Sequence, residues 1–131
     1  MQPVHTITSS ILFTQPNETA GLIGRFNEYS GSKNTQNFNG YIYTLNAKGS
    51  WYLYKNSKIN GAIILASGIL TNIKTQTWYT LTLQMHNTSI IGSINGIITT
   101  HIQDATYHKG LAGIMSNWAF VQFNNLQISP N

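Results

Sequence analysis

The sequence predicts an all-β protein, a two-sheet jelly-roll sandwich of the concanavalin A-like or laminin G-like kind. Apolar residues recur with period two along most of the chain, which is the spacing of a strand with one buried face. Clusters of Gly, Asn, Ser and Lys interrupt this pattern at short intervals, as turns do in a sheet protein. The chain of 131 residues has the size of a single domain with its own core.

Ten strands are expected, each an alternating run bounded by turn residues. They span residues 4–13, 20–27, 39–45, 50–55, 62–66, 78–85, 88–94, 97–102, 110–116 and 119–128. Pro16-Asn17-Glu18-Thr19 is the turn between the first two, and a long loop runs from Glu28 to Asn39. Asn46-Ala47-Lys48-Gly49 joins the third strand to the fourth, and we expect a tight hairpin turn of the kind that Asn95-Gly96 forms.

The clearest alternation lies in the strand over 78–85. Its core face is expected to consist of Tyr79, Leu81, Leu83 and Met85, with Trp78, Thr80, Thr82 and Gln84 on the opposite face. The next strand contributes Ile90 and Ile94 to the same core. Asn95-Gly96 follows and predicts a type I′ turn, because both central residues of that turn need positive φ. These strands and the one after them therefore form a meander.

The last strand carries an irregularity in its spacing. Phe123 and Leu126 are three residues apart, which places them on opposite faces of a regular strand. Both can face the core only if one extra residue is inserted between them. We therefore expect a β-bulge at Asn124-Asn125.

The composition excludes several function classes. Only 8% of the residues are charged, and the net charge of +4 comes from Arg25 and six scattered lysines, so no basic stripe for a nucleic acid is expected. There is no Cys, which excludes disulfides and thiolate chemistry and leaves the redox compartment open. The apolar runs are much shorter than the ~20 residues that cross a bilayer. No transmembrane segment or signal peptide is expected, so secretion would have to be encoded outside this chain.

Intrinsic catalysis is not expected. The chain has three carboxylates, Glu18, Glu28 and Asp104, and each is interpreted as a solvated loop acid. Glycoside hydrolysis generally needs two carboxyl groups placed across the scissile bond. The four histidines show neither a metal-ligand spacing nor the context of a catalytic triad. We therefore expect no catalytic residue and no metal.

Carbohydrate binding is the favoured function, because sugars stack their C–H faces on aromatic rings and need fixed hydrogen-bonding groups nearby. The candidate residues are Trp118, Tyr107, His108, Trp78 and Arg25. Alternatives stay open for two of them, since a neighbouring strand can half cover Trp78, and Arg25 can be an ion pair or a stacked surface side chain. Trp51 can belong to the core or pair across strands with nearby tyrosines. Two N-glycosylation sequons, at Asn17 and Asn87, lie in predicted turns.

Several short motifs follow one another in a characteristic order. They are Gly24-Arg25, Asn46-Ala47-Lys48-Gly49-Ser50, Ala66-Ser67-Gly68, Trp78 to Leu83, Gly110 to Ile114, and Gln122-Phe123-Asn124-Asn125. In this order and spacing they resemble the C-terminal lectin-like domain of galactocerebrosidase, a glycoside hydrolase family. The last motif of the family reads Gln-Phe-Asp-Asn. Each motif alone is unspecific, so the resemblance depends on the whole set.

The resemblance implies a lectin-like module that is itself non-catalytic. Its expected partners are a galactoside or glycolipid headgroup and the catalytic barrel domain of a parent hydrolase, which is secreted or lysosomal and cleaves galactosylceramide. It also implies an opening strand upstream of residue 4, so we expect a single domain over residues 1–131 that is N-terminally incomplete, with an open sheet edge. The alternative function is a laminin G-like protein-interaction sandwich without sugar affinity.

Calcium binding is disfavoured. In the resembling family, calcium is held in part by the Asp of Gln-Phe-Asp-Asn and by groups on the opening strand. Asn124 stands at the position of that Asp and offers a neutral carbonyl where calcium gains most from a carboxylate. We therefore expect no cofactor and at most a vestigial metal site at Asn124, with the amide of this residue capping the bulge.

Overall fold

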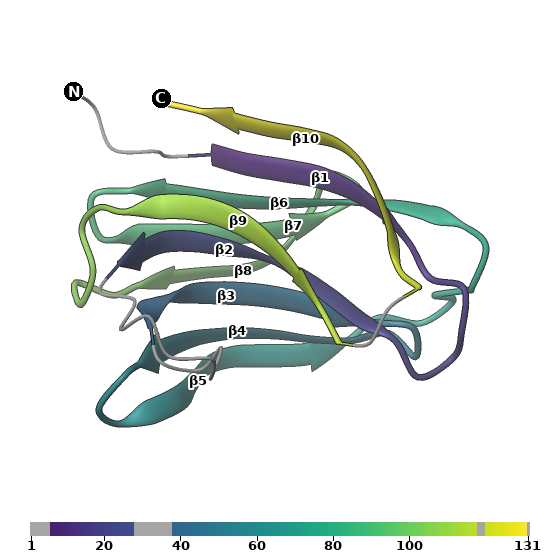
Figure 1. The fold of residues 1–131 in the computed structure, drawn as a ribbon, viewed down its shortest axis with the longest axis horizontal. Coiled ribbons are helices and arrows are strands. Elements are labelled where there is room, and N and C mark those ends of the chain that lie inside the picture. The colour runs from purple at the N-terminus through teal and green to yellow at the C-terminus, as the bar shows by residue number, and fades with distance from the viewer. Residues whose placement is uncertain (1–5, 28–37, 118–119, 131) are drawn as a thin grey trace.

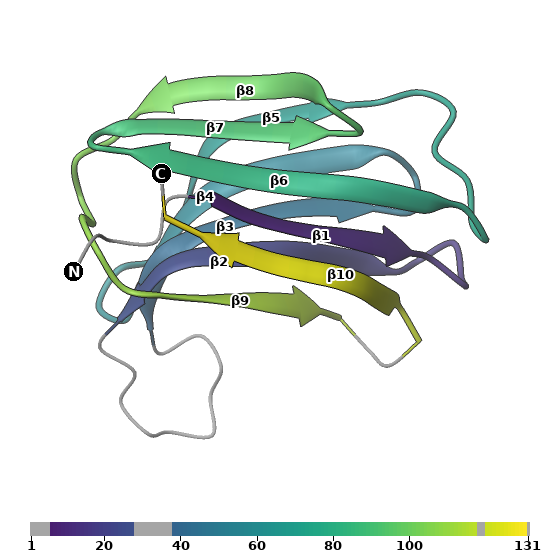
Figure 2. The ribbon, with the colours of Figure 1, turned by 90° about the horizontal axis from the view of Figure 1, so that it is seen from above.

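The computed structural model describes residues 6–27, 38–117 and 120–130, and in them the chain is a sandwich of two antiparallel sheets (Figures 1 and 2). The strands are β1 (Thr6–Leu12), β2 (Thr19–Asn27), β3 (Asn39–Asn46), β4 (Ser50–Ser57), β5 (Gly61–Ile69), β6 (Trp78–His86), β7 (Ser89–Ile94), β8 (Ile97–Gln103), β9 (Leu111–Ser116) and β10 (Gln122–Ser129). One sheet, the β6 sheet, has the order β10-β1-β6-β7-β8, and the other, the β3 sheet, has the order β5-β4-β3-β2-β9. The predicted sandwich and its ten strands are confirmed.

The strand bounds differ from the prediction mainly in two places. β5 runs from Gly61 to Ile69, well beyond the expected 62–66, because the polar residues Ser67 and Gly68 continue the pairing with β4. β10 begins at Gln122, later than the expected 119, and residue 119 itself lies outside the described residues. The expected loop from Glu28 to Asn39 also falls largely outside them.

The core lies between the two sheets and has the composition that alternation predicts. Tyr79, Leu81, Leu83 and Met85 on β6 are buried, as are Ile90 and Ile94 on β7. The facing β3 sheet contributes Leu22, Tyr41, Tyr43, Leu45, Trp51 and Leu53. Burying one such side chain contributes about 1.5–3 kcal/mol, so this core stabilises the fold without a disulfide.

The two predicted hairpin turns are of different kinds. Asn95 and Gly96 have φ of 52° and 79°, which confirms the type I′ turn between β7 and β8. In the turn from Asn46 to Gly49 only Gly49 has a positive φ, 97°, so the prediction of a second turn of the same kind is wrong. The Asn46 side-chain oxygen accepts the backbone N–H groups of Lys48 and Ser50 at 3.0 Å each, which holds this turn in another geometry.

The bulge in β10 is confirmed, one residue later than expected. Thr8 pairs with Gln127 and Ser10 pairs with Asn124, so two residues of β10, Asn125 and Leu126, stand opposite Ser9. Asn125 has a φ of 56°, as the inserted residue of a bulge often does. The Ser9 hydroxyl donates to the backbone carbonyl of Asn124 at 3.2 Å, so the hydrogen bond at the bulge uses this carbonyl and not the side-chain amide that we expected.

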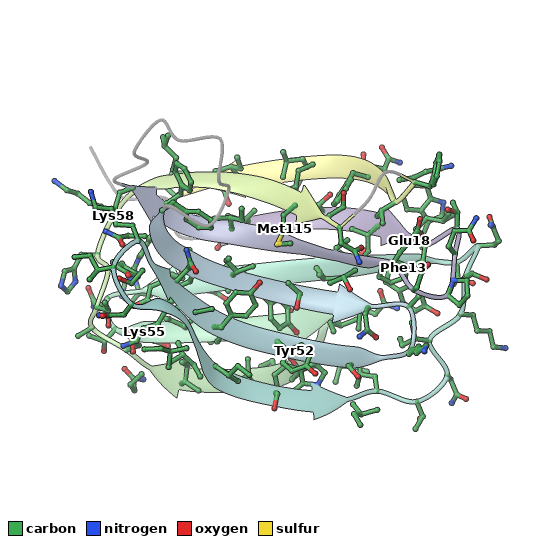
Figure 3. All side chains as sticks on the ribbon, turned by 60° about the horizontal axis from the view of Figure 1, so that its bottom comes forward. Phe13, Glu18, Tyr52, Lys55, Lys58 and Met115 are labelled. Carbon is green, nitrogen blue, oxygen red and sulfur yellow. The ribbon has the colours of Figure 1, made fainter. Side chains whose placement is uncertain are left out.

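Glu18 is not the solvated loop acid that the sequence predicted. Its exposed fraction is 4%, and it lies at one end of the sandwich, beside Phe13 (Figure 3). The carboxylate accepts the backbone N–H groups of Thr14 at 2.7 Å and Gln15 at 3.1 Å. These charge-assisted bonds fix the turn between β1 and β2. The sequence could not show that the backbone N–H groups of this turn point toward the Glu18 carboxylate.

Candidate functional site

A groove lies on the outer face of the β3 sheet. It has a volume of about 610 Å³, within the range of small-ligand sites. Its floor is one cross-strand row, in which Ile23 pairs with Ile42, Ile42 with Tyr54 and Tyr54 with Ile64. The alternation of β3 and β4 produces this row, because Tyr41, Tyr43, Trp51 and Leu53 turn inward and leave the intervening residues outside.

The groove has different chemistry at its two ends. Tyr52, Met115 and Ser116 line one end, where Tyr52 is 38% exposed, and Figure 3 looks onto this face with Tyr52 on β4 and Met115 on β9. Phe26 and Phe38 form the other end, with their ring centroids 4.9 Å apart. Of the described residues along the groove, none is charged. A neutral ligand with an apolar face therefore fits it best.

Asn56 fixes the Phe38 end of the groove. This side chain is 4% exposed, and its amide donates to the backbone carbonyl of Phe38 at 2.7 Å. The backbone carbonyl of Asn56 accepts the Tyr107 hydroxyl at 2.7 Å. The hydroxyl of the neighbouring Tyr54 is protonated and able to donate at neutral pH, and burial raises its pKa further above the ordinary value of 10.0. Asn56 thus positions the groove wall, while the Tyr52 and Tyr54 rings offer stacking surfaces.

A hydrogen-bonded network next to this end holds the connection between β8 and β9. The Tyr41 hydroxyl donates to the Asp104 carboxylate at 2.5 Å, and the Lys55 ammonium donates to the same carboxylate at 3.2 Å. Burial alone would raise the pKa of Asp104, but the hydrogen bonds from Tyr41, Thr106 and Lys55 outweigh it and lower the pKa to about 2. Burial and the Asp104 contact raise the pKa of Tyr41 to about 12. Asp104 is therefore a structural anion, and its prediction as a solvated acid was wrong.

Arg25 belongs to the same network and not to a surface site. Its exposed fraction is 2%, and one guanidinium nitrogen donates to the carbonyls of Asn87 at 2.9 Å and Tyr107 at 2.8 Å. A φ of 51° at Arg25 accompanies the irregular pairing of β2 between Gly24 and Asn27, which turns the side chain inward. Burial lowers the pKa of this guanidinium. Arg25 therefore ties β2 to two loops, and the reading of this residue as a surface side chain is wrong.

Of the other predicted sugar-binding residues, Trp78 lies far from Tyr107 and His108 in the part of the chain that the structure describes. Trp78 is 44% exposed and lies on the outer face of the β6 sheet, which is the opposite side of the molecule from the groove. Tyr107 is partly buried and packs edge-on against Tyr41, with centroids 5.3 Å apart. His108 is exposed in the loop that follows, and Trp118 lies outside the described residues. Asn17 and Asn87 are exposed in their turns.

Sequence reasoning missed Tyr52, Tyr54, Ile23 and Ile42 as members of one site. The available signal was the alternation Trp51-Tyr52-Leu53-Tyr54, which sends two tyrosines outward once the other two residues are buried. The described residues contain no cluster of three or more His, Cys, Asp or Glu that could hold a metal ion. The calcium expectation at Asn124 stays a prediction.

The chain matches one family along nearly its whole length. The model of the galactocerebrosidase C-terminal lectin domain family covers residues 4–131. The chain belongs to this family. The lectin domain is thus a carbohydrate-recognition domain of the kind that accompanies a glycoside hydrolase, and no finding favours the alternative of a protein-interaction sandwich. No curated protein sequence matches the chain.

Solved structures share the fold of the lectin domain. The carbohydrate binding module CBM66 from Bacillus subtilis is 18% identical with a TM-score of 0.77, over 96% of this chain and 74% of that one. Sheep galectin-11, in complex with glycerol, is 5% identical with a TM-score of 0.72, over 98% and 92% of the two chains. The Caenorhabditis elegans galectin LEC-6 is 13% identical with a TM-score of 0.67, over 98% and 84%. At these identities the likeness establishes the fold alone.

No helix in the described part of the lectin domain is long and apolar enough to cross a membrane.

Proposed function

We propose that the lectin domain binds a neutral glycan, a galactoside or the headgroup of a glycolipid, in the groove on the β3 sheet. The observation that carries this proposal is the uncharged groove in which the rings of Tyr52 and Tyr54 stand on the sheet face. Pyranose rings stack on such aromatic side chains. The galactoside is suggested by the family, and the apolar end at Phe26 and Phe38 would accommodate the first apolar atoms beside a glycolipid headgroup.

The proposed role is non-catalytic, as an accessory module of a secreted or lysosomal hydrolase. Glycoside hydrolysis generally needs two carboxyl groups about 5–9.5 Å apart. Glu18 lies at one end of the sandwich, whereas Lys55, the ion-pair partner of Asp104, lies at the other (Figure 3). Both carboxylates are also engaged in holding turns. Glu28 lies outside the described residues. Of the described carboxylates, no pair therefore spans the groove.

A glycan array with matched variants tests this function. The wild-type chain should bind galactosides on the array more strongly than other sugars. Tyr52→Ala should weaken that binding by roughly tenfold, the equivalent of about 1.4 kcal/mol for a lost stacking contact. Trp78→Ala removes an aromatic side chain of comparable exposure from the opposite sheet and should leave binding unchanged. A blank array together with tight binding of a protein partner would instead support the laminin G-like alternative.

A further inference from the structure

Among the described residues, no strand pairs with the outer edge of β5. This strand pairs with β4 on one side and forms the border of the β3 sheet. Natural edge strands are usually short or carry charges or proline, because bare N–H and C=O groups recruit other strands. β5 has nine residues, and residues 59–73 contain no charged residue and no proline. Within β5 itself, the feature that protects the edge is a bulge at Leu65, where the register with β4 shifts.

The flank around β5 is also unusually apolar. Ile63, Ile64 and Ile69 on β5 are 46%, 61% and 75% exposed. β8, the edge strand of the other sheet, lies beside β5, and Figure 2 shows the two along one side of the sandwich. Its Ile97 and Ile98 are 68% and 62% exposed. Exposed apolar residues gathered over two layers indicate an interaction surface.

A partner strand suits this flank better than a lipid surface does. Hydrocarbon cannot satisfy the unpaired backbone groups of an edge strand, and each unsatisfied group there costs several kcal/mol. Another β-strand supplies hydrogen bonds to these groups and covers the isoleucines at the same time. β5 is about 30 Å long for its nine residues, long enough for several hydrogen-bonded pairs with a partner strand.

We propose that the partner is a second copy of this chain, paired antiparallel through β5 about a two-fold axis between Leu65 and Ala66. The bulge divides β5 into two straight runs of equal length, Gly61–Ile64 and Ala66–Ile69. In this arrangement the first run of each copy lies beside the second run of the other. The interface is then isologous, with the same strand used twice.

The side chains of the two runs are complementary in this register. Ile64 stands opposite Ser67 of the second copy, and Ile63 stands opposite its Gly68, so each large side chain meets a small one. Ala62 stands opposite Ile69 in the same way. The faces agree as well, since Ala62, Ile64, Ser67 and Ile69 all lie on the outer face through their pairing with Asn56, Tyr54, Tyr52 and Ser50. Interlocking of large and small residues gives dense packing.

Charge does not oppose this register. β5 itself carries no lysine, and Lys58 and Lys74 lie beyond its two ends. Lys55 on the neighbouring β4 pairs with Ile63, and its charge is matched by the ion pair with Asp104. The net charge of +4 on each chain gives only a long-range repulsion, which salt screens.

The pairing would join the two grooves. Ile64 and Ala62 line the groove and lie at its open side on β5. A second copy would cover this side and set a second groove next to the first, so that one dimer presents two sites on a continuous ten-stranded surface. Two sites in a fixed geometry raise the avidity for a glycan-coated surface. Only this last step depends on the proposed function, and the pairing itself does not.

Sedimentation analysis of the purified chain over a wide concentration range tests the pairing. The wild type should be a dimer, and its dissociation constant should fall as the salt concentration rises. Ser67→Lys places a charge opposite Ile64 of the second copy on a position that is already exposed and polar, and should yield a monomer. Ile63→Lys should do the same from the other face of the strand. Leu111→Lys is the matched control, because Leu111 is 69% exposed on β9, the opposite edge of the same sheet, and should leave the dimer intact.

A wild-type chain that stays monomeric at millimolar concentration would overturn the proposal. A dimer that Leu111→Lys disrupts and Ser67→Lys does not would also overturn it, since the pairing would then use β9. Sedimentation of a monomeric chain with neutral phosphatidylcholine vesicles would assign the flank to lipid instead. Glycan binding by Ile63→Lys monomers separates the two proposals, because Ile63 lies on the face of β5 away from the groove, which is retained when the pairing is lost.

Discussion

Replacing Asp104 with Asn should remove an acid-sensitive part of the stability. The carboxylate is 12% exposed, accepts hydrogen bonds from Tyr41 and Thr106 and pairs with Lys55. Its pKa in the folded protein is about 2, against an ordinary value of 3.8. Because the folded pKa is the lower one, ionisation favours the folded state. The contribution is complete above the ordinary pKa and is lost as the pH falls through the folded pKa.

The magnitude follows from the difference between these two pKa values. At about 1.4 kcal/mol per pKa unit, the ionised carboxylate contributes about 2 kcal/mol to the free energy of unfolding at neutral pH. In a chain of this size, that corresponds to roughly 6 °C in the midpoint of thermal unfolding. Asn retains most of the shape and the acceptor oxygen but does not titrate. The variant should therefore be less stable than the wild type at pH 7 and nearly equal to it at pH 2.

Urea denaturation of both proteins between pH 2 and pH 7 measures this difference. The assay is unusually clean, because the chain contains only three Asp and Glu residues in all. Lys55→Met serves as a companion variant, which removes the ion pair while Tyr41 and Thr106 still donate. A stability difference between wild type and Asp104→Asn that stays constant across this pH range would refute the reasoning.

Three further outcomes are expected. The purified chain should not hydrolyse a chromogenic galactoside above background, and turnover that Glu18→Gln or Glu28→Gln abolishes would refute this. Calorimetry should detect no calcium binding at micromolar free ion, because Asn124 supplies no carboxylate; micromolar affinity that is lost in Asn124→Ala would contradict it. A chain expressed through a secretory pathway should carry N-glycans at Asn17 and Asn87, both exposed in turns, and mass spectrometry that shows no change on enzymatic deglycosylation would contradict it.

The strands were predictable because each depends on local patterning. Leu81 and Leu83 must share a face in any regular strand, whatever lies opposite them. Asn95-Gly96 specifies its turn through the φ values that these residues accept at low cost. Even the bulge was visible as an odd spacing between Phe123 and Leu126, since only an inserted residue restores both side chains to one face.

The site was harder to predict because it depends on which strands become neighbours. Tyr54 becomes part of a groove only when β2, β3 and β5 place isoleucines beside it. Arg25 and Glu18 were expected at the surface, as charged residues usually are. Their burial depends on backbone groups that the fold turns toward them, the carbonyls of Asn87 and Tyr107 for Arg25 and the amides of Thr14 and Gln15 for Glu18. The spacing of residues in the sequence does not indicate which backbone groups will face these side chains.

The location of the bound sugar tests the central claim most directly. Backbone amide resonances of the labelled chain can be followed by NMR while a galactoside is titrated in. We expect the shifts to concentrate on β3 and β4 around Ile42, Tyr52 and Tyr54, and to vanish in Tyr52→Ala. The assignment of the groove would be contradicted if the shifts concentrated around Trp78 on the opposite sheet and remained unchanged in Tyr52→Ala.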